Sequence, residues 1–251
     1  MQWAKSVVNG LSAEWHPSRW FTATTFWFPF VISIVTIVAA VLARPVFDFI
    51  IGEDLLAEDL QVVGWAVALY FCIRIARNAD FPTSTRVLMA VLGAGIFFII
   101  GEEISWGQRI LDFQTPAELV EQNRQGESNL HNIYGVQDVF SWLMFLIGGY
   151  GVGASWFAMK RYGNYESWSP LTRTLAPHPI LIPSFLLMFV WRSYRNFFEP
   201  PESLYYGVSE FGEITELALS SVFGLYTWRR WANPFAKSET PALAIEDVQS
   251  S

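Results

Sequence analysis

The chain has 251 residues, of which 52% are hydrophobic and only 16% are charged, and it contains 21 Phe and 12 Trp. This composition is too apolar and too aromatic for an ordinary soluble domain. The formal net charge of −7 gives no reason to expect a nucleic-acid partner, because such partners attract basic surfaces.

Long apolar blocks separated by short polar joints predict membrane-spanning helices, since about 20 apolar residues cross a hydrocarbon core about 30 Å thick. We therefore predict an all-α, polytopic transmembrane helix bundle over residues 1–235, with a lipid bilayer around it. The polar residues 236–251 predict a disordered cytoplasmic tail, and the first twenty residues predict a short helix on the inner interface. The six predicted spans are residues 26–43, 60–76, 87–107, 136–159, 180–198 and 211–231.

The distribution of Lys and Arg predicts that both termini are cytoplasmic, because cytoplasmic loops carry the excess of positive charge. In this orientation eleven of the 16 basic residues lie inside, and 17 of the 23 acidic residues lie outside. We expect a multi-pass protein of the bacterial inner membrane. Its outer face should carry an acidic field that attracts cations.

Sequence motifs identify no cofactor. The single cysteine, Cys72, has no partner for a disulfide. The chain contains no Gly-rich phosphate loop, no HExxH and no CxxC motif.

The loop after the third predicted span is the most organised polar segment. Thr115, Pro116 and Glu118 have the spacing of a capping box with proline at the first helical position, which predicts a short amphipathic extracytoplasmic helix ending near Gln122. The following residues 125–132 are dense in hydrogen-bonding groups. They could form a solvated connector, or they could fold down as a lid over the helix ends.

Three segments of this region read GEEISWGQR (101–109), TP (115–116) and QGESNLHN (125–132). Together they resemble a signature of uncharacterised bacterial multi-pass membrane proteins. The resemblance is limited to this region. It implies a membrane location but no activity, cofactor or catalytic residue.

Charged residues on three predicted spans lie at a similar depth. Counted at about 1.5 Å per residue from the cytoplasmic end of each predicted span, these residues lie roughly 20 to 25 Å along their helices. They are Glu102, Arg192, Arg195, Glu213 and Glu216. A charge at mid-depth costs roughly 2.5 to 3.5 kcal/mol, so these side chains should face protein or water and pair. We predict a polar chamber between the third, fifth and sixth spans, open to the outside, with the loop around His131 as its cover.

The candidate ligand-binding residues are those expected to face this chamber: Glu102, Glu103, Ser105, Arg109, Asn129, His131, Arg192, Arg195, Glu213 and Glu216.

Glu102 and Glu103 differ by about 100° around a helix, so only one of them is expected to face the chamber. Glu102 is favoured because Ser105 and Arg109 would share its side of the helix.

The catalytic candidates are Glu102, His131, Glu213 and Glu216, since buried carboxylates near cations suit acid–base chemistry. Each has a structural alternative. Arg192 and Arg195 could form interhelical ion pairs with Glu213 and Glu216. His131 could be a loop residue that hydrogen-bonds to the backbone or to a carboxylate.

Three functions are compatible with these patterns. The chamber could bind or pass a cation, a proton or a small polar ligand. The chain could instead be a membrane-embedded enzyme at the outer leaflet, with a metal such as magnesium or calcium if it uses one, because these ions prefer oxygen ligands. It could also be a structural or assembly subunit with membrane-protein partners.

Overall fold

The computed structural model describes residues 18–52, 55–111, 113–123 and 126–233. The predicted tail over residues 236–251 lies outside these ranges, as does nearly all of the predicted N-terminal interfacial helix. Within them the regular secondary structure is entirely helical. Five segments are long and apolar enough to cross a membrane, which agrees with the predicted class of helical membrane protein.

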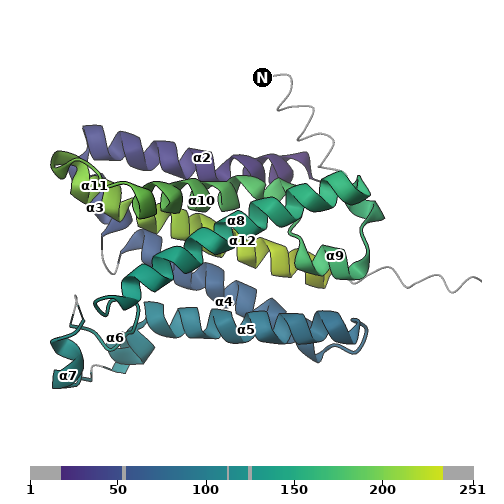
Figure 1. Cartoon of the computed structure of the whole chain (residues 1–251), viewed down its shortest axis with the longest axis horizontal. Coiled ribbons are helices and arrows are strands. Elements are labelled where there is room, and N and C mark those ends of the chain that lie inside the picture. Colours follow the sequence, from purple (N-terminus) through teal and green to yellow (C-terminus); the bar gives the residue numbers. More distant parts are fainter. Residues whose placement is uncertain (1–17, 53–54, 112, 124–125, 234–251) are drawn as a thin grey trace, which may run out of the picture.

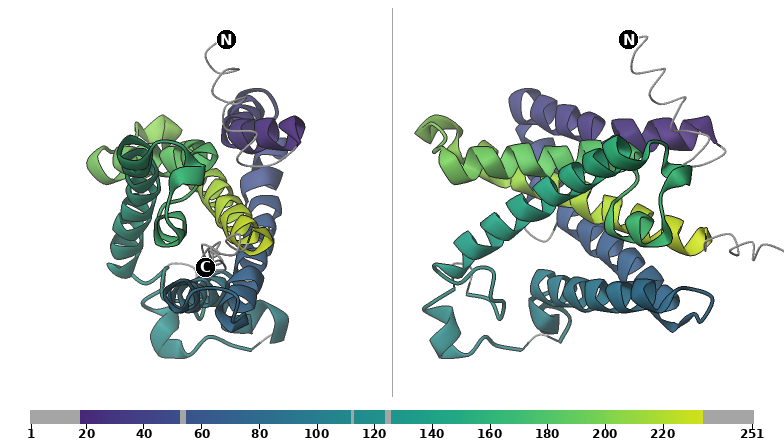
Figure 2. Two further views of the ribbon diagram at one scale, coloured as in Figure 1. Left: turned by 90° about the vertical axis from the view of Figure 1, so that its right-hand side faces the viewer. Right: turned by 45° about the vertical axis from the view of Figure 1, so that its right-hand side comes forward.

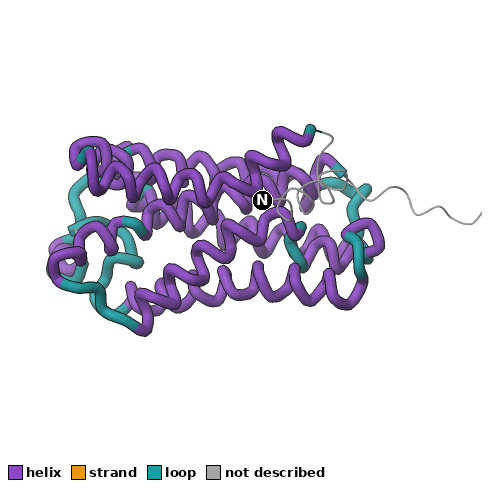
Figure 3. Tube along the Cα trace, turned by 90° about the horizontal axis from the view of Figure 1, so that it is seen from above, coloured by secondary structure: helices purple, strands orange, loops and turns teal. Residues whose placement is uncertain are grey.

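Six long helices follow the predicted spans and run along the molecule, with the connecting loops gathered at its two ends (Figures 1 and 3). They are α2 (Arg19–Leu42), α4 (Leu56–Arg77), α5 (Thr83–Glu103), α8 (Val136–Tyr162), α10 (Ile182–Phe197) and α12 (Gly212–Ala232). Shorter helices lie at the bundle ends: α3 (Arg44–Ile51), α6 (Gln108–Leu111), α7 (Ala117–Val120), α9 (Pro170–Leu175) and α11 (Tyr205–Glu210). The sequence patterns predicted only α7 among these short helices.

The α5 helix ends earlier than the predicted third span. It stops at Glu103, and the next turn has left-handed backbone at Ser105 (φ 47°) and Trp106 (φ 54°). The prediction that Ser105 and Arg109 continue the helical face of Glu102 was therefore wrong. Hydropathy did not reveal this end, because Ile104 and Trp106 are as apolar as a continuing span.

The predicted capping box at the start of α7 was also wrong. The helix begins at Ala117 after Pro116, and no side chain caps it. The hydroxyl of Thr115 instead accepts a hydrogen bond from Gln108 Nε2 at 2.8 Å and lies 3.3 Å from Ser128 Oγ. A tertiary contact thus replaces the local one that the spacing predicted.

The α12 helix lies inside the bundle, between α4 and α10 (Figure 2). Twelve of its 21 residues are buried. Small residues permit the close contact with α4, since a methyl group on Gly64 would lie 2.8 Å from Ser220 Oγ and one on Gly224 would lie 3.3 Å from Gly64 O. Because protein surrounds it, α12 can carry more polar residues than the helices that cover it.

A second close contact joins α8 to α10. A methyl group on Gly148 would lie 2.7 Å from the backbone nitrogen of Phe189 and 3.0 Å from the carbonyl oxygen of Phe185. Unlike a side chain, the backbone of α10 cannot change rotamer to make room for a methyl group. Only glycine therefore fits at position 148.

The two ends of the bundle differ in charge. The end where α2 begins and α12 ends is basic, with Asp80 and Glu166 as its acidic residues in the described part of the chain (Figure 1). Its basic residues are Arg19, Arg74, Arg77, Arg86, Lys160, Arg161, Arg173, Arg229 and Arg230. The acidic residues of the described chain are concentrated at the opposite end.

Replacing Gly148 by alanine should separate α8 from α10. We expect Gly148→Ala to lower the free energy of unfolding by about 1 to 3 kcal/mol, the usual cost of overpacking. Gly153→Ala on the same helix is the matched control, because a methyl group there meets no atom within 4 Å. The free energy of unfolding of both variants can be measured in mixed detergent micelles. Equal values for Gly148→Ala and Gly153→Ala would contradict the described α8–α10 contact.

Candidate functional site

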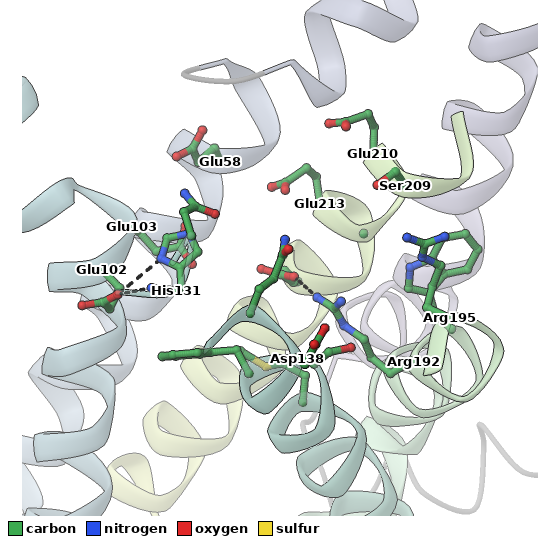
Figure 4. Close-up of a pocket in the computed structure, with 18 of the residues that line it drawn as sticks. Glu58, Glu102, Glu103, His131, Asp138, Arg192, Arg195, Ser209, Glu210 and Glu213 are labelled. Carbon is green, nitrogen blue, oxygen red and sulfur yellow. Dashed lines mark hydrogen bonds and ion pairs between the residues drawn. The ribbon is translucent and has the colours of Figure 1, made fainter. Parts of the chain in front are cut away.

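A cavity of about 820 Å³ lies at the acidic end of the bundle (Figure 4). Helices α5 and α10 end there, and α4, α8 and α12 begin there. The charged residues that line it are Glu58, Glu102, Glu103, Glu127, Asp138, Glu210, Glu213 and Glu216, together with Arg192 and Arg195. Eight carboxylates therefore share this space with two guanidinium groups.

Most of the predicted chamber residues surround this cavity. Glu102, Glu103, Asn129, His131, Arg192, Arg195, Glu213 and Glu216 all line it. Ser105 is buried beside it without lining it, and the side chain of Arg109 lies outside the described part of the structure. That any of these residues binds a ligand stays a prediction.

Both Glu102 and Glu103 line the cavity, so the expectation that only one of them would do so was wrong. The reason is that α5 ends at Glu103. Because the cavity lies at the end of the helix, residues on different sides of its last turn can line it.

Glu102 is buried, with 2% of its surface exposed, and its carboxylate accepts three hydrogen bonds. Trp106 Nε1 donates to Oε1 at 2.7 Å, and the backbone N–H groups of Leu130 and His131 donate to Oε2 at 2.7 and 2.8 Å. Hydrogen bonds to a charged group are worth roughly 1.5 to 3 kcal/mol each. Glu102 therefore anchors the loop before α8 to the end of α5.

The left-handed turn after α5 brings Trp106 to Glu102. Non-glycine residues in this conformation cost about 1 to 3 kcal/mol each and persist only where their surroundings hold them. Here the indole ring lies over Gly101, where a methyl group would be 2.9 Å from the ring atoms, and its N–H reaches the carboxylate of Glu102. The glycine, the glutamate and the tryptophan of the signature thus form one local unit.

The remaining signature residues bind the loop to the same turn. Ser105 Oγ and Asn129 Nδ2 both donate to Glu127 Oε2 at 2.7 Å, and Asn123 Nδ2 donates to the backbone and side-chain oxygens of Asn129 at 2.9 and 2.8 Å. The backbone of Ser128 donates to Gln108 Oε1 at 2.8 Å. This network supports the lid hypothesis over the solvated connector.

The imidazole of His131 stands beside Glu102. Its Nδ1 lies 3.4 Å from Glu102 Oε2, and its ring packs edge-on against Phe140 with the centroids 6.2 Å apart. This geometry matches the structural alternative, a loop histidine next to a carboxylate. A catalytic role for either residue stays a prediction.

The two arginines have different partners. Arg192 forms an ion pair with Glu216 across α10 and α12. Arg195 instead places its guanidinium 5.4 Å from the centroid of the Tyr205 ring. The predicted interhelical ion pairing is therefore found for Glu216.

Glu213 is held by an amide that the sequence patterns did not single out. Gln61 Nε2 donates to Glu213 Oε2 at 2.8 Å and to its backbone oxygen at 3.1 Å. Gln61 is fully buried in α4. Gln61 lies at the edge of the predicted span 60–76, close after Glu58 and Asp59, so its position in the sequence gave no signal of this contact.

Glu58, Asp138 and Glu210 also line the cavity but were absent from the predicted set. Glu58 and Asp138 lie in the first turns of α4 and α8. Acidic residues are common at helix starts because they interact favourably with the helix dipole. The positions of Glu58 and Asp138 therefore gave no reason to assign them to a site, whereas Glu210 precedes Glu213 and Glu216 by three and six residues, a helical spacing that could have included it.

Among the residues that the structure describes, no group of three or more His, Cys, Asp and Glu side chains is placed to hold a metal ion. No protein-family model, no curated protein and no solved structure matches this chain. The roles of the cavity residues therefore rest on their own contacts.

Removing the charge of Glu102 should release the loop. We expect Glu102→Gln to raise amide hydrogen exchange in residues 127–132 by at least about tenfold, because weakening hydrogen bonds to a charged group costs about 1.5 kcal/mol or more. Glu121→Gln is the matched control, since Glu121 is exposed in the same loop. Exchange measured by mass spectrometry checks this, and an equal rate in both variants would show that Glu102 does not hold the loop.

Proposed function

We propose that this chain is a six-span membrane protein that binds a small organic cation in the cavity at its extracytoplasmic end. The observation that supports this most directly is the charge of the lining, with eight carboxylates and two guanidinium groups. One of those guanidinium groups, that of Arg192, is already paired with Glu216. An excess of carboxylates in a recessed space favours cations.

The spread of the carboxylates favours an extended organic cation. Glu58 and Glu103 come from α4 and α5, whereas Glu210 and Glu213 come from α11 and α12, and Figure 4 shows these four carboxylates spread around the cavity. A diamine or polyamine can place one ammonium group near each pair. The volume of about 820 Å³ also falls in the usual range of small-molecule sites, about 300 to 1,000 Å³.

Binding is proposed in preference to passage because the bundle interior is filled. Large side chains such as those of Trp65, Met188 and Leu219 belong to the main hydrophobic core between the helices. The cavity lies at one end of this core. The enzyme and assembly hypotheses stay predictions, and no contact in the cavity favours either of them.

The proposed topology adds α12 to the five apolar segments. At 21 residues it is long enough to cross a hydrocarbon core, and its enclosure by other helices removes the need for an apolar surface. The basic end of the bundle is assigned to the cytoplasm of a bacterial cell by the positive-inside rule. The acidic cavity then opens to the outside of the inner membrane.

Titration of the purified protein with putrescine and spermidine tests the ligand class. We expect saturable binding of both amines, weakened by salt because the attraction is electrostatic, and no binding of 1,4-butanediol, the uncharged analogue of putrescine. The double variant Glu58→Gln/Glu210→Gln should lose about five- to thirtyfold in affinity, from roughly 0.5 to 1 kcal/mol for each partly exposed pair. Isothermal titration calorimetry in detergent provides the measurement.

The matched control is Glu118→Gln/Glu121→Gln, which removes the same charge from exposed positions outside the cavity. It should bind both amines like the unaltered protein. Absence of saturable amine binding, or an equal loss in the control, would refute the proposed ligand.

Labelling of single cysteines tests the orientation. In a Cys72→Ala background, a membrane-impermeant maleimide added to intact cells should label Ala117→Cys, on α7 at the acidic end, and should not label Ser167→Cys at the basic end. Both positions are exposed in the structure, so permeabilised cells should label both. The reverse pattern in intact cells would invert the proposed topology.

A further inference from the structure

A second cavity lies on the side of the bundle, between α4 and α5. Its volume is about 490 Å³, and its described lining comes from these two helices alone. Nine of the ten lining residues are apolar or carry a thiol, and the tenth is Arg77. Both helices belong to segments apolar enough to cross a membrane, so in the proposed topology, on which this inference rests, the groove faces the hydrocarbon layer.

Small residues on α5 create the groove. Ala90 and Ala94 are exposed along it, while Gly93 is buried at its floor. A methyl group on Gly93 would lie 3.2 Å from Cys72 Cβ, which shows how closely the helices approach there. The groove is therefore apolar along its described lining, with Arg77 as its cationic residue.

Arg77 is the uncommitted cation among the neighbouring arginines. Arg74 places its guanidinium 5.2 Å from the centroid of the Trp231 ring, and Arg86 Nε donates to the carbonyl oxygen of Ala76 at 3.1 Å. The side chain of Arg77 is exposed at the end of α4 and makes no hydrogen bond or ion pair with the described residues.

We propose that this groove binds one acyl chain of an anionic phospholipid, with the lipid phosphate at Arg77. The apolar channel matches a hydrocarbon chain, and a guanidinium at its end matches a phosphate, which arginine binds through two parallel hydrogen bonds. Basic pockets between transmembrane helices on the cytoplasmic side are typical sites for anionic headgroups. The position of Arg77 at the basic end of the bundle fits this arrangement.

Native mass spectrometry of the purified full chain tests the site, with phosphatidylglycerol and phosphatidylcholine of identical acyl chains as probes. The unaltered protein should bind phosphatidylglycerol more tightly. Arg77→Gln should reduce that preference by about fivefold, the effect of one basic residue near an anionic headgroup. Ala94→Leu, which fills the groove from its exposed side, should weaken the binding of both lipids.

Two matched controls accompany these variants. Arg161→Gln removes the same charge from the basic end of α8, and Gly95→Leu adds bulk to α5 where no atom lies within 4 Å of the new methyl position. Neither should change lipid binding. Ala90→Leu repeats the filling test if Ala94→Leu fails to fold, and Arg77→Gln decides the headgroup contact by itself.

The proposal would be overturned if Arg77→Gln and Arg161→Gln preferred phosphatidylglycerol over phosphatidylcholine to the same degree. It would also be overturned if Ala94→Leu or Ala90→Leu changed the oligomeric state and left lipid binding intact, because a protein helix would then occupy the groove.

Discussion

A charged side chain inside a bundle of apolar helices must face a polar partner or water, and the position of α12 meets this requirement. The helix carries Glu213, Glu216 and several hydroxyl groups, and it lies between α4 and α10. Its neighbours supply the partners, Gln61 from α4 and Arg192 from α10. The other long helices present their apolar faces outward around it. Where this enclosure opens, at the start of α12, the acidic cavity lies.

The loop before α8 depends on a second constraint, the burial of Glu102. A carboxylate that is 2% exposed needs hydrogen-bond donors, and it obtains them from the Trp106 indole and from two successive backbone N–H groups. The signature segments 101–109 and 125–132 are therefore two parts of one hydrogen-bond network. Their polar residues are needed to hold the loop over the cavity, which explains much of their density without catalysis. Acids on the other walls, such as Glu58 and Glu210, line the cavity without belonging to the signature segments.

The two proposed sites reflect the charge difference between the ends of the bundle. At the acidic end, carboxylates from several helices surround a recess that suits an organic cation. At the basic end, one uncommitted arginine ends an apolar groove that suits an anionic lipid. The same asymmetry that orients a membrane protein would thus select ligands of opposite charge on its two sides.

The sequence by itself determined the helical class, the approximate positions of the six long helices and the gathering of charged residues at one end, because hydropathy and charge are read from local stretches of chain. It also placed Arg192, Arg195, Glu213 and Glu216 in one layer, because depth along a helix follows from residue number. Only the tertiary structure decided which side chains pair. Glu216 meets Arg192 while Glu213 meets Gln61, and this depends on how each helix is rotated about its axis. The end of α5 at Glu103 likewise depends on residues distant in sequence, since Ser105 donates to Glu127 and the backbone N–H groups of Leu130 and His131 donate to Glu102.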